Sequence, residues 1–114
     1  MEISKINWMV EAKKRFGDDT NNWKFKCHMC GRVQSYSSLK EEIGAGTFNP
    51  KRSFPIDENG MPDVTIYAEC TSPDCNYVSY GLFSGPVTVI IDPKKPHDAN
   101  LKKNCTIVFE FAEA

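Results

Sequence analysis

Two close pairs of cysteines constrain the fold of this chain more than any other feature. Two residues separate Cys27 from Cys30, and four residues separate Cys70 from Cys75. Such spacing lets both sulfurs of a pair reach one ion, and four thiolates complete the tetrahedral coordination that zinc prefers. Gly31, directly after Cys30, can adopt the positive φ that a metal-binding turn often requires. The sequence therefore predicts one zinc ion bound by all four cysteines.

A zinc ion with four thiolate ligands has no coordination position left for water or a substrate. We therefore expect a structural zinc ion that stabilises the fold and takes no part in chemistry. Two disulfides are the alternative, but the N-terminus has no secretory pattern, and pairing would leave Cys105 over. Cys105 shares one face of a predicted strand with Ile107, Phe109 and Phe111, which indicates a small core residue instead of a ligand.

Length and charge limit the remaining options. The 114 residues are expected to form one domain, and no apolar run approaches the ~20 residues that span a bilayer. We therefore expect a cytoplasmic protein without a membrane partner. The formal net charge of −1 gives no overall attraction to phosphate, so a nucleic-acid site would have to be local.

The first predicted element is an amphipathic helix over residues 5–16. Ser4 can cap its first turn, and Gly17 can end it. Its apolar residues recur at roughly helical spacing, at Ile3, Ile6, Met9, Val10 and Phe16. The basic residues of its last turn either complement the helix dipole or contact a nucleic acid or an acidic partner; they are Lys13, Lys14 and Arg15.

Both cysteine pairs are predicted to lie at the tips of antiparallel β-hairpins, as zinc knuckles at residues 27–30 and 70–75. The flanking segments with strand-like composition are residues 23–26, 32–35, 64–70 and 77–83. A C-terminal hairpin is expected over residues 87–111. The predicted fold class is thus α+β and rich in β-structure: a four-cysteine zinc ribbon with an N-terminal amphipathic helix and a C-terminal β-hairpin.

A short helix and a long loop are predicted between the knuckles. Ser38 and Glu41 match a capping box, which predicts a helix that runs to Ile43. Residues 44–63 carry three of the seven glycines and three of the seven prolines, which is typical of a loop or insertion. The aromatic residues of this loop, Phe48 and Phe54, either fold back on the core or form a surface for another protein. We consider them as protein contacts, together with Tyr80 beyond the second knuckle.

The segment between the last two predicted strands is the strongest candidate for a local basic surface. Its prolines and asparagines are typical of exposed turns, and its lysines are Lys94, Lys95, Lys102 and Lys103. Beside the first knuckle, Lys24, Lys26 and Arg32 could add phosphate contacts. Trp23 or Tyr36 could stack on bases, although Trp23 also fits a core position.

Two motifs around the cysteines resemble those of a family of small phage and prophage proteins. The first is Trp-Lys-Phe-Lys-Cys at residues 23–27, followed by Cys30 and Gly31. The second is Cys-Asn-Tyr at residues 75–77, followed by Gly-Leu-Phe at residues 81–83. His28 departs from the family's usual proline without affecting the metal ligands. The resemblance implies a phage-encoded accessory protein in the cytoplasm of a bacterial host, and it leaves the target open.

The sequence contains no convincing catalytic constellation, so we expect neither an enzyme nor a small-molecule substrate. His28 lies within the first knuckle and His97 within the basic segment, and a lone histidine is weak evidence for catalysis. The first hypothesis is a non-enzymatic zinc-binding protein that binds and modulates a host protein. The alternative is a zinc ribbon that binds nucleic acid in association with transcription. The nearly neutral net charge favours the first hypothesis.

Overall fold

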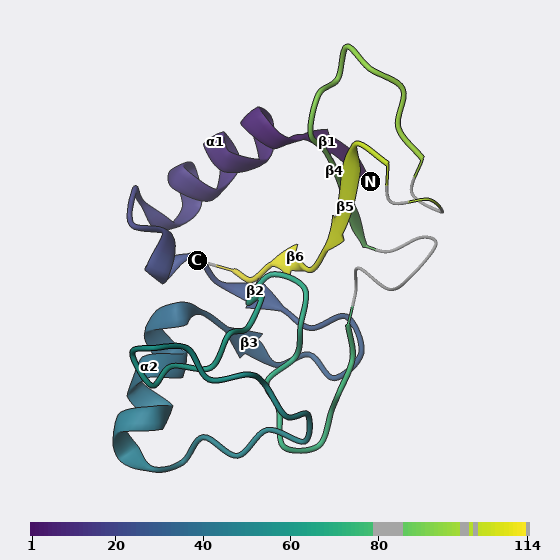
Figure 1. The fold of residues 1–114 in the computed structure, drawn as a ribbon. Helices are drawn as coiled ribbons and strands as arrows, with labels where there is room; N and C mark the ends of the chain where they lie inside the picture. Colours follow the sequence, from purple (N-terminus) through teal and green to yellow (C-terminus); the bar gives the residue numbers. More distant parts are fainter. Residues whose placement is uncertain (79–85, 99–100, 102, 114) are drawn as a thin grey trace.

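A computed structural model of the chain describes residues 1–78, 86–98, 101 and 103–113 (Figure 1). Within these residues, two helices and two small three-stranded sheets form an α+β fold. In Figure 1, helix α1 and one sheet form the upper part of the molecule, and α2 with long irregular segments forms the lower part. No helix in the described part of the chain is long and apolar enough to cross a membrane.

The first sheet has the strand order β1-β4-β5 and joins distant parts of the chain. Strand β1 (Glu2–Ser4) runs parallel to β4 (Val87–Ile90), which pairs antiparallel with β5 (Cys105–Val108). The β4–β5 pair is the central part of the hairpin expected at residues 87–111, whereas β1 was not predicted. The buried side chains of one face, Val87, Val89 and Val108, pack with Ile3 and Trp8.

Helix α1 (Lys5–Phe16) has the bounds expected from the sequence. The side chain of Ser4 accepts a hydrogen bond from the Asn7 N–H at 3.2 Å, and Gly17 ends the helix with φ 91°. The expected apolar face is wrong in part, because Ile6 is 73% exposed and Val10 is 58% exposed. The side chains that do face the core are Trp8, Met9, Ala12 and Phe16.

The second sheet has the order β3-β2-β6 and lies beside the cysteines. Its strands β2 (Phe25–Lys26), β3 (Val33–Gln34) and β6 (Glu110–Phe111) are all antiparallel to their neighbours. One row across the sheet, Gln34, Phe25 and Phe111, faces inward; the other row is exposed and consists of Val33, Lys26 and Glu110. The strand expected at residues 105–111 is thus divided between two sheets, with the fully buried Phe109 at the division.

Helix α2 (Tyr36–Ala45) begins earlier and ends later than the sequence suggested. The N-cap is Ser35, three residues before the expected Ser38, and Ser38 completes the capping box by bonding back to the Ser35 N–H at 3.0 Å. Glu41 therefore has no part in the cap. Gly46, with φ 73°, ends the helix instead of Gly44, so the first residues of the expected loop at 44–63 are helical.

The strand expected at residues 64–70, before the second knuckle, is absent from the described residues. Residues 64–70 form a tight turn instead, in which the Ala68 and Glu69 N–H groups donate to Thr65 O at 2.9 and 2.8 Å. The carboxylate of Glu69 accepts from the Thr65 N–H at 2.9 Å, which closes the turn. A single bridge joins Glu69 to Val78, and residues 79–83 lie outside the described part of the chain.

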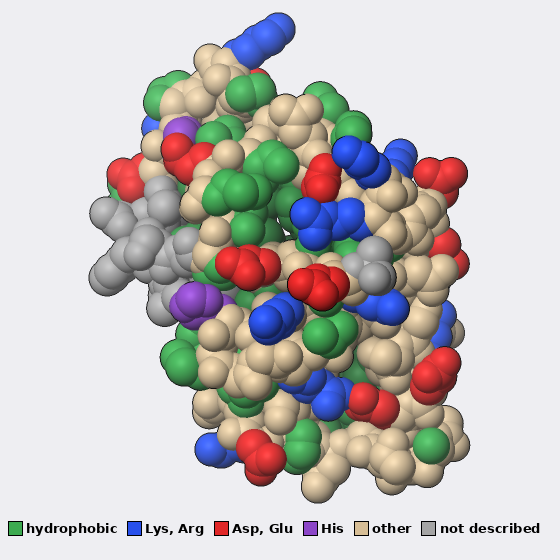
Figure 2. All heavy atoms as spheres, turned by 180° about the vertical axis from the view of Figure 1, so that it is seen from behind, with side chains coloured by type: hydrophobic (Ala, Val, Ile, Leu, Met, Phe, Trp, Pro, Cys, Tyr) green, Lys and Arg blue, Asp and Glu red, His purple; other side chains and the backbone are tan. Residues whose placement is uncertain are grey.

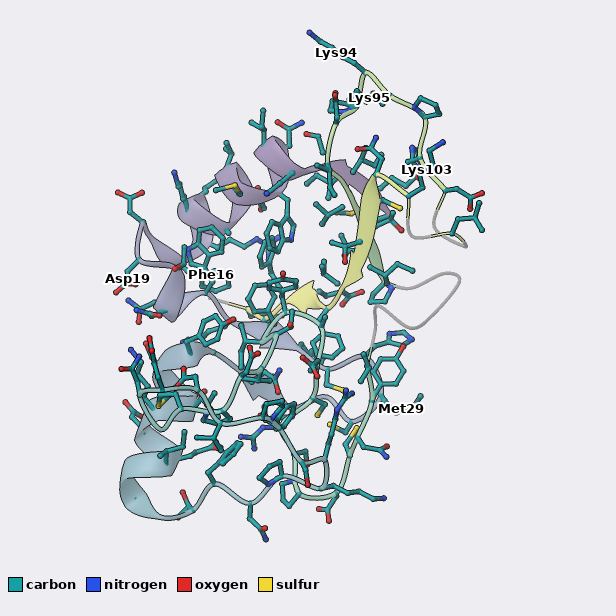
Figure 3. All side chains as sticks on the ribbon, viewed as in Figure 1. Phe16, Asp19, Met29, Lys94, Lys95 and Lys103 are labelled. Carbon is teal, nitrogen blue, oxygen red and sulfur yellow. The ribbon has the colours of Figure 1, made fainter. Side chains whose placement is uncertain are left out.

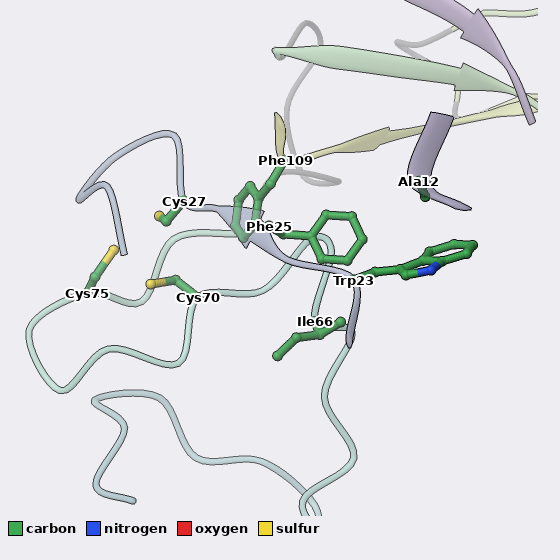
Figure 4. Close-up of a cluster of buried hydrophobic side chains, with 8 residues drawn as sticks. All are labelled: Ala12, Trp23, Phe25, Cys27, Ile66, Cys70, Cys75 and Phe109. Carbon is green, nitrogen blue, oxygen red and sulfur yellow. The ribbon is translucent and has the colours of Figure 1, made fainter. Parts of the chain in front are cut away.

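The main hydrophobic core connects α1 with the cysteines (Figure 4). Its buried members are Ala12, Trp23, Phe25, Cys27, Ile66, Cys70, Cys75 and Phe109. Trp23 is a core residue, and its indole N–H donates to Gly17 O at 2.9 Å. Trp8 contacts the rings of Trp23, Phe25, Tyr67 and Phe111 at centroid distances of 5.7 to 6.1 Å. The aromatic cluster therefore holds α1 against the second sheet.

Candidate metal centre

The sulfur atoms of Cys27, Cys30, Cys70 and Cys75 all lie within 4.8 Å of one another. The Sγ atoms of Cys30 and Cys70 are 3.5 Å apart. Zinc–sulfur bonds of about 2.3 Å in a tetrahedron place the sulfurs about 3.8 Å apart, whereas a disulfide requires about 2.05 Å. The spacing matches a shared metal ion, and all four cysteines are free of disulfides. Figure 4 shows the sulfurs of Cys27, Cys70 and Cys75 pointing toward one another.

The first cysteine pair lies in a tight turn between β2 and β3. The Cys27 N–H donates to Arg32 O at 2.9 Å, and the Gly31 N–H donates to Cys27 O at 3.0 Å. Gly31 has φ 77°, as expected from its place after the second cysteine. The backbone N–H groups of Met29 and Cys30 point at the Cys27 sulfur. This turn places both sulfurs on one side and directs amide dipoles at a thiolate.

The second pair lies in a wider loop that has no sheet around it. The Cys70 N–H donates to Tyr77 O at 3.0 Å, and the Cys75 N–H donates to Ser72 O at 3.4 Å. The hydroxyl of Ser72 also accepts from the Asp74 N–H at 3.2 Å. Ser72 therefore organises the four-residue spacer, and the position of Cys75 depends on turn hydrogen bonds instead of strand pairing.

The buried side chain of Gln34 joins the two cysteine loops. Its Nε2 donates to Ile66 O at 2.8 Å and Glu69 O at 2.6 Å. Its Oε1 accepts from both the backbone N–H and the hydroxyl of Thr71, each at 3.0 Å. All four hydrogen-bonding positions of the amide are thus filled, and Gln34 is only 1% exposed. Sequence reasoning missed this residue, because a glutamine in a short strand gives no signal of burial.

Arg32 reinforces the same junction from the surface side. Its Nε donates to the Thr71 hydroxyl at 3.1 Å, and its guanidinium forms an ion pair with Glu42 of α2. The sequence suggests Arg32 as a phosphate contact, but in the structure its guanidinium forms these bonds within the fold. The junction therefore links the first knuckle, the second knuckle and α2.

Burial raises the pKa of two of the four clustered cysteines, Cys27 and Cys70. Cys27, Cys70 and Cys75 are buried, whereas Cys30 is exposed. Burial is the main cause that raises the pKa of the Cys27 and Cys70 thiols. Burial also acts to raise the pKa of Cys30, but the Arg32 N–H and the neighbouring Cys70 outweigh it, and that pKa is lowered. The raised pKa favours the protonated thiol at Cys27 and Cys70, so a metal ion that bound these sulfurs would have to displace their protons.

The basic residues proposed from the sequence do not gather at one place. Figure 3 shows Lys94, Lys95 and Lys103 at one end of the molecule, far from Phe16, the last residue of α1. Lys13, Lys14 and Arg15 directly precede Phe16. Lys102 lies outside the described residues. The two basic groups are therefore separate surfaces.

The aromatic residues proposed as protein contacts are only partly accessible. Phe48 and Phe54 are half-buried, and the guanidinium of Arg52 lies 5.9 Å from the centre of the Phe54 ring. Tyr80 lies outside the described residues. Tyr36, considered for base stacking, is also half-buried and donates from its hydroxyl to Val64 O at 3.2 Å. Cys105 is buried in β5, apart from the four clustered cysteines.

These features define a small α+β protein with a four-cysteine centre that could hold a metal ion. The family model described as VVA0879-like matches residues 4–102, and the chain belongs to that family. No curated protein and no solved structure matches the chain.

Proposed function

We propose that the chain binds one zinc ion through Cys27, Cys30, Cys70 and Cys75, and that this ion is structural. The observation that carries the proposal is that the four sulfur atoms all lie within 4.8 Å of one another. They come from two loops that no common sheet holds together. Thiolate ligands favour zinc over magnesium or calcium, which prefer oxygen. With four protein ligands the ion has no open position, so it stabilises the fold and activates no substrate.

The protein is further proposed to be non-enzymatic. The closed ligand set supports this, as do the surroundings of the two histidines. His28 is exposed in the first knuckle, and His97 bonds to the exposed carboxylate of Glu2 at 2.6 Å. Neither arrangement resembles a base held beside a buried nucleophile.

The proposed partner is another protein, and nucleic acid is the second candidate. The separation of the two lysine groups favours a protein, because a nucleic-acid backbone is normally bound along a continuous basic surface. Large exposed apolar side chains favour it as well, and they include Ile6, Val10, Met29, Val33 and Ile56. The resemblance to phage and prophage proteins suggests a host protein as the target, bound and modulated in the bacterial cytoplasm.

The test combines metal analysis with partner capture. The purified protein should contain one zinc ion per chain by mass spectrometry of the metal, and the Cys75→Ser variant should contain less. Tagged protein should then retain a stoichiometric bacterial protein from lysate after nuclease treatment. Partners that disappear with nuclease, or nucleic acid alone on the tagged protein, would support the nucleic-acid alternative. A chain without zinc would contradict the metal assignment whichever partner is found.

A further inference from the structure

The outward side of α1 carries two large apolar side chains that the fold does not use. Ile6 and Val10 are one helical turn apart, so they are neighbours on the helix surface. They are 73% and 58% exposed, while the inward side of the same helix packs Trp8, Met9 and Ala12 on the core. A helix with apolar side chains on both sides is normally packed against other structure on both sides. The outward side therefore lacks a partner in the isolated chain.

The charge around these two residues is positive. Helix α1 has four cationic side chains and one carboxylate, Glu11, which pairs with Arg15 at 2.8 Å. The complete chain has a net charge of −1, so this is a local excess. In the view of Figure 2, several Lys and Arg side chains lie at the upper right, in the region that α1 occupies, with some Asp and Glu side chains among them.

Helix stability explains only part of this charge. Lys13 and Lys14 complement the dipole at the C-terminal end of α1. Lys5 lies in the first turn, where the dipole disfavours a cation and where α1 has no acidic residue. Lys5 therefore adds to the charge of the helix, but it lies on the side of Trp8 and Met9 and is not a neighbour of Ile6 or Val10.

A cavity of about 640 Å³ adjoins this side of the helix. Its apolar wall is formed by Ile3, Trp8, Val87, Phe109 and Phe111. Val10 also belongs to its lining, together with the charged residues Glu11, Arg15 and Glu110. Binding pockets for side chains or small ligands have this size and this apolar character. A segment that crosses α1 over Val10 can therefore place one anchor side chain in the cavity, as buried anchors do in protein interfaces.

We propose that Ile6 and Val10, with Lys13 and Lys14 beside them, form a docking surface for an acidic protein segment that carries aliphatic or aromatic anchors. We call these four residues the α1 ridge. The assignment rests on the proposed protein-binding function and adds the surface and the chemistry of the partner. Charge complementarity specifies the acidic flanks, and the apolar centre specifies the anchors. Nucleic acid fits less well, because the ridge has no aromatic side chain for stacking. A membrane surface also fits less well, because a helix that binds at a lipid interface normally has a wider apolar face than Ile6 and Val10 provide.

The test is a selection from a random peptide library displayed on particles, with the zinc-loaded protein as bait. Enriched peptides should contain Asp and Glu next to Leu, Ile, Phe or Trp. Their dissociation constants, measured by fluorescence anisotropy, should rise at least about tenfold for Ile6→Ser with Val10→Ser. Lys13→Glu with Lys14→Glu should weaken binding by a similar factor, and the wild-type affinity should fall as salt rises.

Matched controls separate the ridge from other exposed residues. Ile56→Ser removes an apolar side chain that is also exposed, and Lys40→Glu reverses an exposed charge on α2; both should leave peptide binding unchanged. Zinc content and circular dichroism must match the wild type for every variant. The surface assignment is overturned if no acidic peptides are enriched, or if the ridge variants bind the enriched peptides as tightly as the wild type.

Two further probes separate this proposal from its competitors. Vesicles of phosphatidylcholine with phosphatidylserine, and a short DNA duplex, should bind much more weakly than the selected peptides. Tight vesicle or DNA binding that depends on Ile6 and Val10 would assign the ridge to that ligand and overturn an acidic protein partner. If peptides bind equally well to the ridge variants, the protein-binding function survives and only its location is wrong.

Discussion

The two parts of the molecule are stabilised by different kinds of interaction. In the sheet half, which consists of β1, α1, β4 and β5, regular strand pairing supports a layer of buried valines. In the cysteine half, which consists of β2, β3, α2, β6 and residues 46–78, the strands are two residues long. Four sulfurs and the amide of Gln34 converge there instead. The comparison indicates that a cysteine cluster that could hold a metal ion, together with buried polar bonds, takes the place of sheet structure where the chain forms little of it.

The two halves are nevertheless connected through specific contacts. The Phe109 N–H, between β5 and β6, donates to Tyr67 O in the cysteine half at 2.7 Å. Trp8 packs on the valines of the sheet half and also on Phe25 of the cysteine half. Loss of structure in the cysteine half should therefore weaken the sheet half without removing its own hydrogen bonds.

Removal of zinc is expected to have the largest effect and to divide the halves most clearly. Structural zinc contributes about 10–16 kcal/mol of apparent binding energy, which is comparable with the stability of a whole domain. A chelator, or Cys75→Ser, should lower the thermal transition by tens of degrees. Hydrogen exchange should accelerate first at residues 25–34 and 64–77, and less at β4 and β5. Cys105→Ala is the control, because it alters a buried cysteine outside the cluster and should keep one zinc ion.

An unchanged thermal transition after confirmed metal loss would contradict the structural role of zinc. Equal loss of protection from hydrogen exchange in both halves would instead show that the chain unfolds as one unit. The two halves would then differ in their native contacts but not in their stability.

Two core substitutions, one in each half, should have smaller effects that again differ between the halves. Gln34→Leu leaves two buried carbonyls and the Thr71 N–H without their partner, and should cost about 3 kcal/mol or more of unfolding free energy. Val89→Ala in the sheet half should cost about 2 kcal/mol through lost apolar burial. Denaturant unfolding measures both. Zinc affinity should fall only for Gln34→Leu, and an equal loss in Val89→Ala would mean that the centre depends on the whole fold.

The pH dependence of stability should have opposite signs with and without zinc. A thiol with a raised pKa favours folding while it is protonated, so the contribution of Cys27 and Cys70 is present below about pH 8.5. It is lost as the pH rises toward the folded-state pKa, and the metal-free protein should be destabilised in alkali. With zinc, protons compete for the thiolates, and stability should fall as the pH is lowered. Thermal melts between pH 5 and about pH 10 measure both slopes, and parallel slopes would contradict zinc coordination by these thiols.

The sequence predicted the features of the fold that depend on nearby residues. The cysteine spacing predicted the cluster, and Ser4 with Gly17 predicted both ends of α1, because ligand turns and helix caps are local. Strand β1 was missed, since its partner β4 lies more than eighty residues away in the sequence. Residues 64–70 have strand-like composition, but Gln34 donates to the Ile66 carbonyl and the Glu69 carboxylate accepts from the Thr65 N–H, and these bonds hold the segment in a turn. A tertiary partner such as Gln34 leaves no pattern in the segment itself.

The smallest predicted effect concerns the N-cap of α2, for which the sequence offers two overlapping capping patterns, one beginning at Ser35 and one at Ser38. Ser35 and Ser38 bond reciprocally, at 3.1 Å for the Ser38 N–H and 3.0 Å for the Ser35 N–H. Ser35→Ala should therefore cost about 1 kcal/mol of unfolding free energy, whereas Glu41→Ala should stay within about 0.5 kcal/mol. Because Arg32 pairs with Glu42 in this helix, fraying of its first turn should also loosen the junction at Thr71. Urea unfolding of both variants decides the point, and a larger loss for Glu41→Ala would place the cap at Ser38.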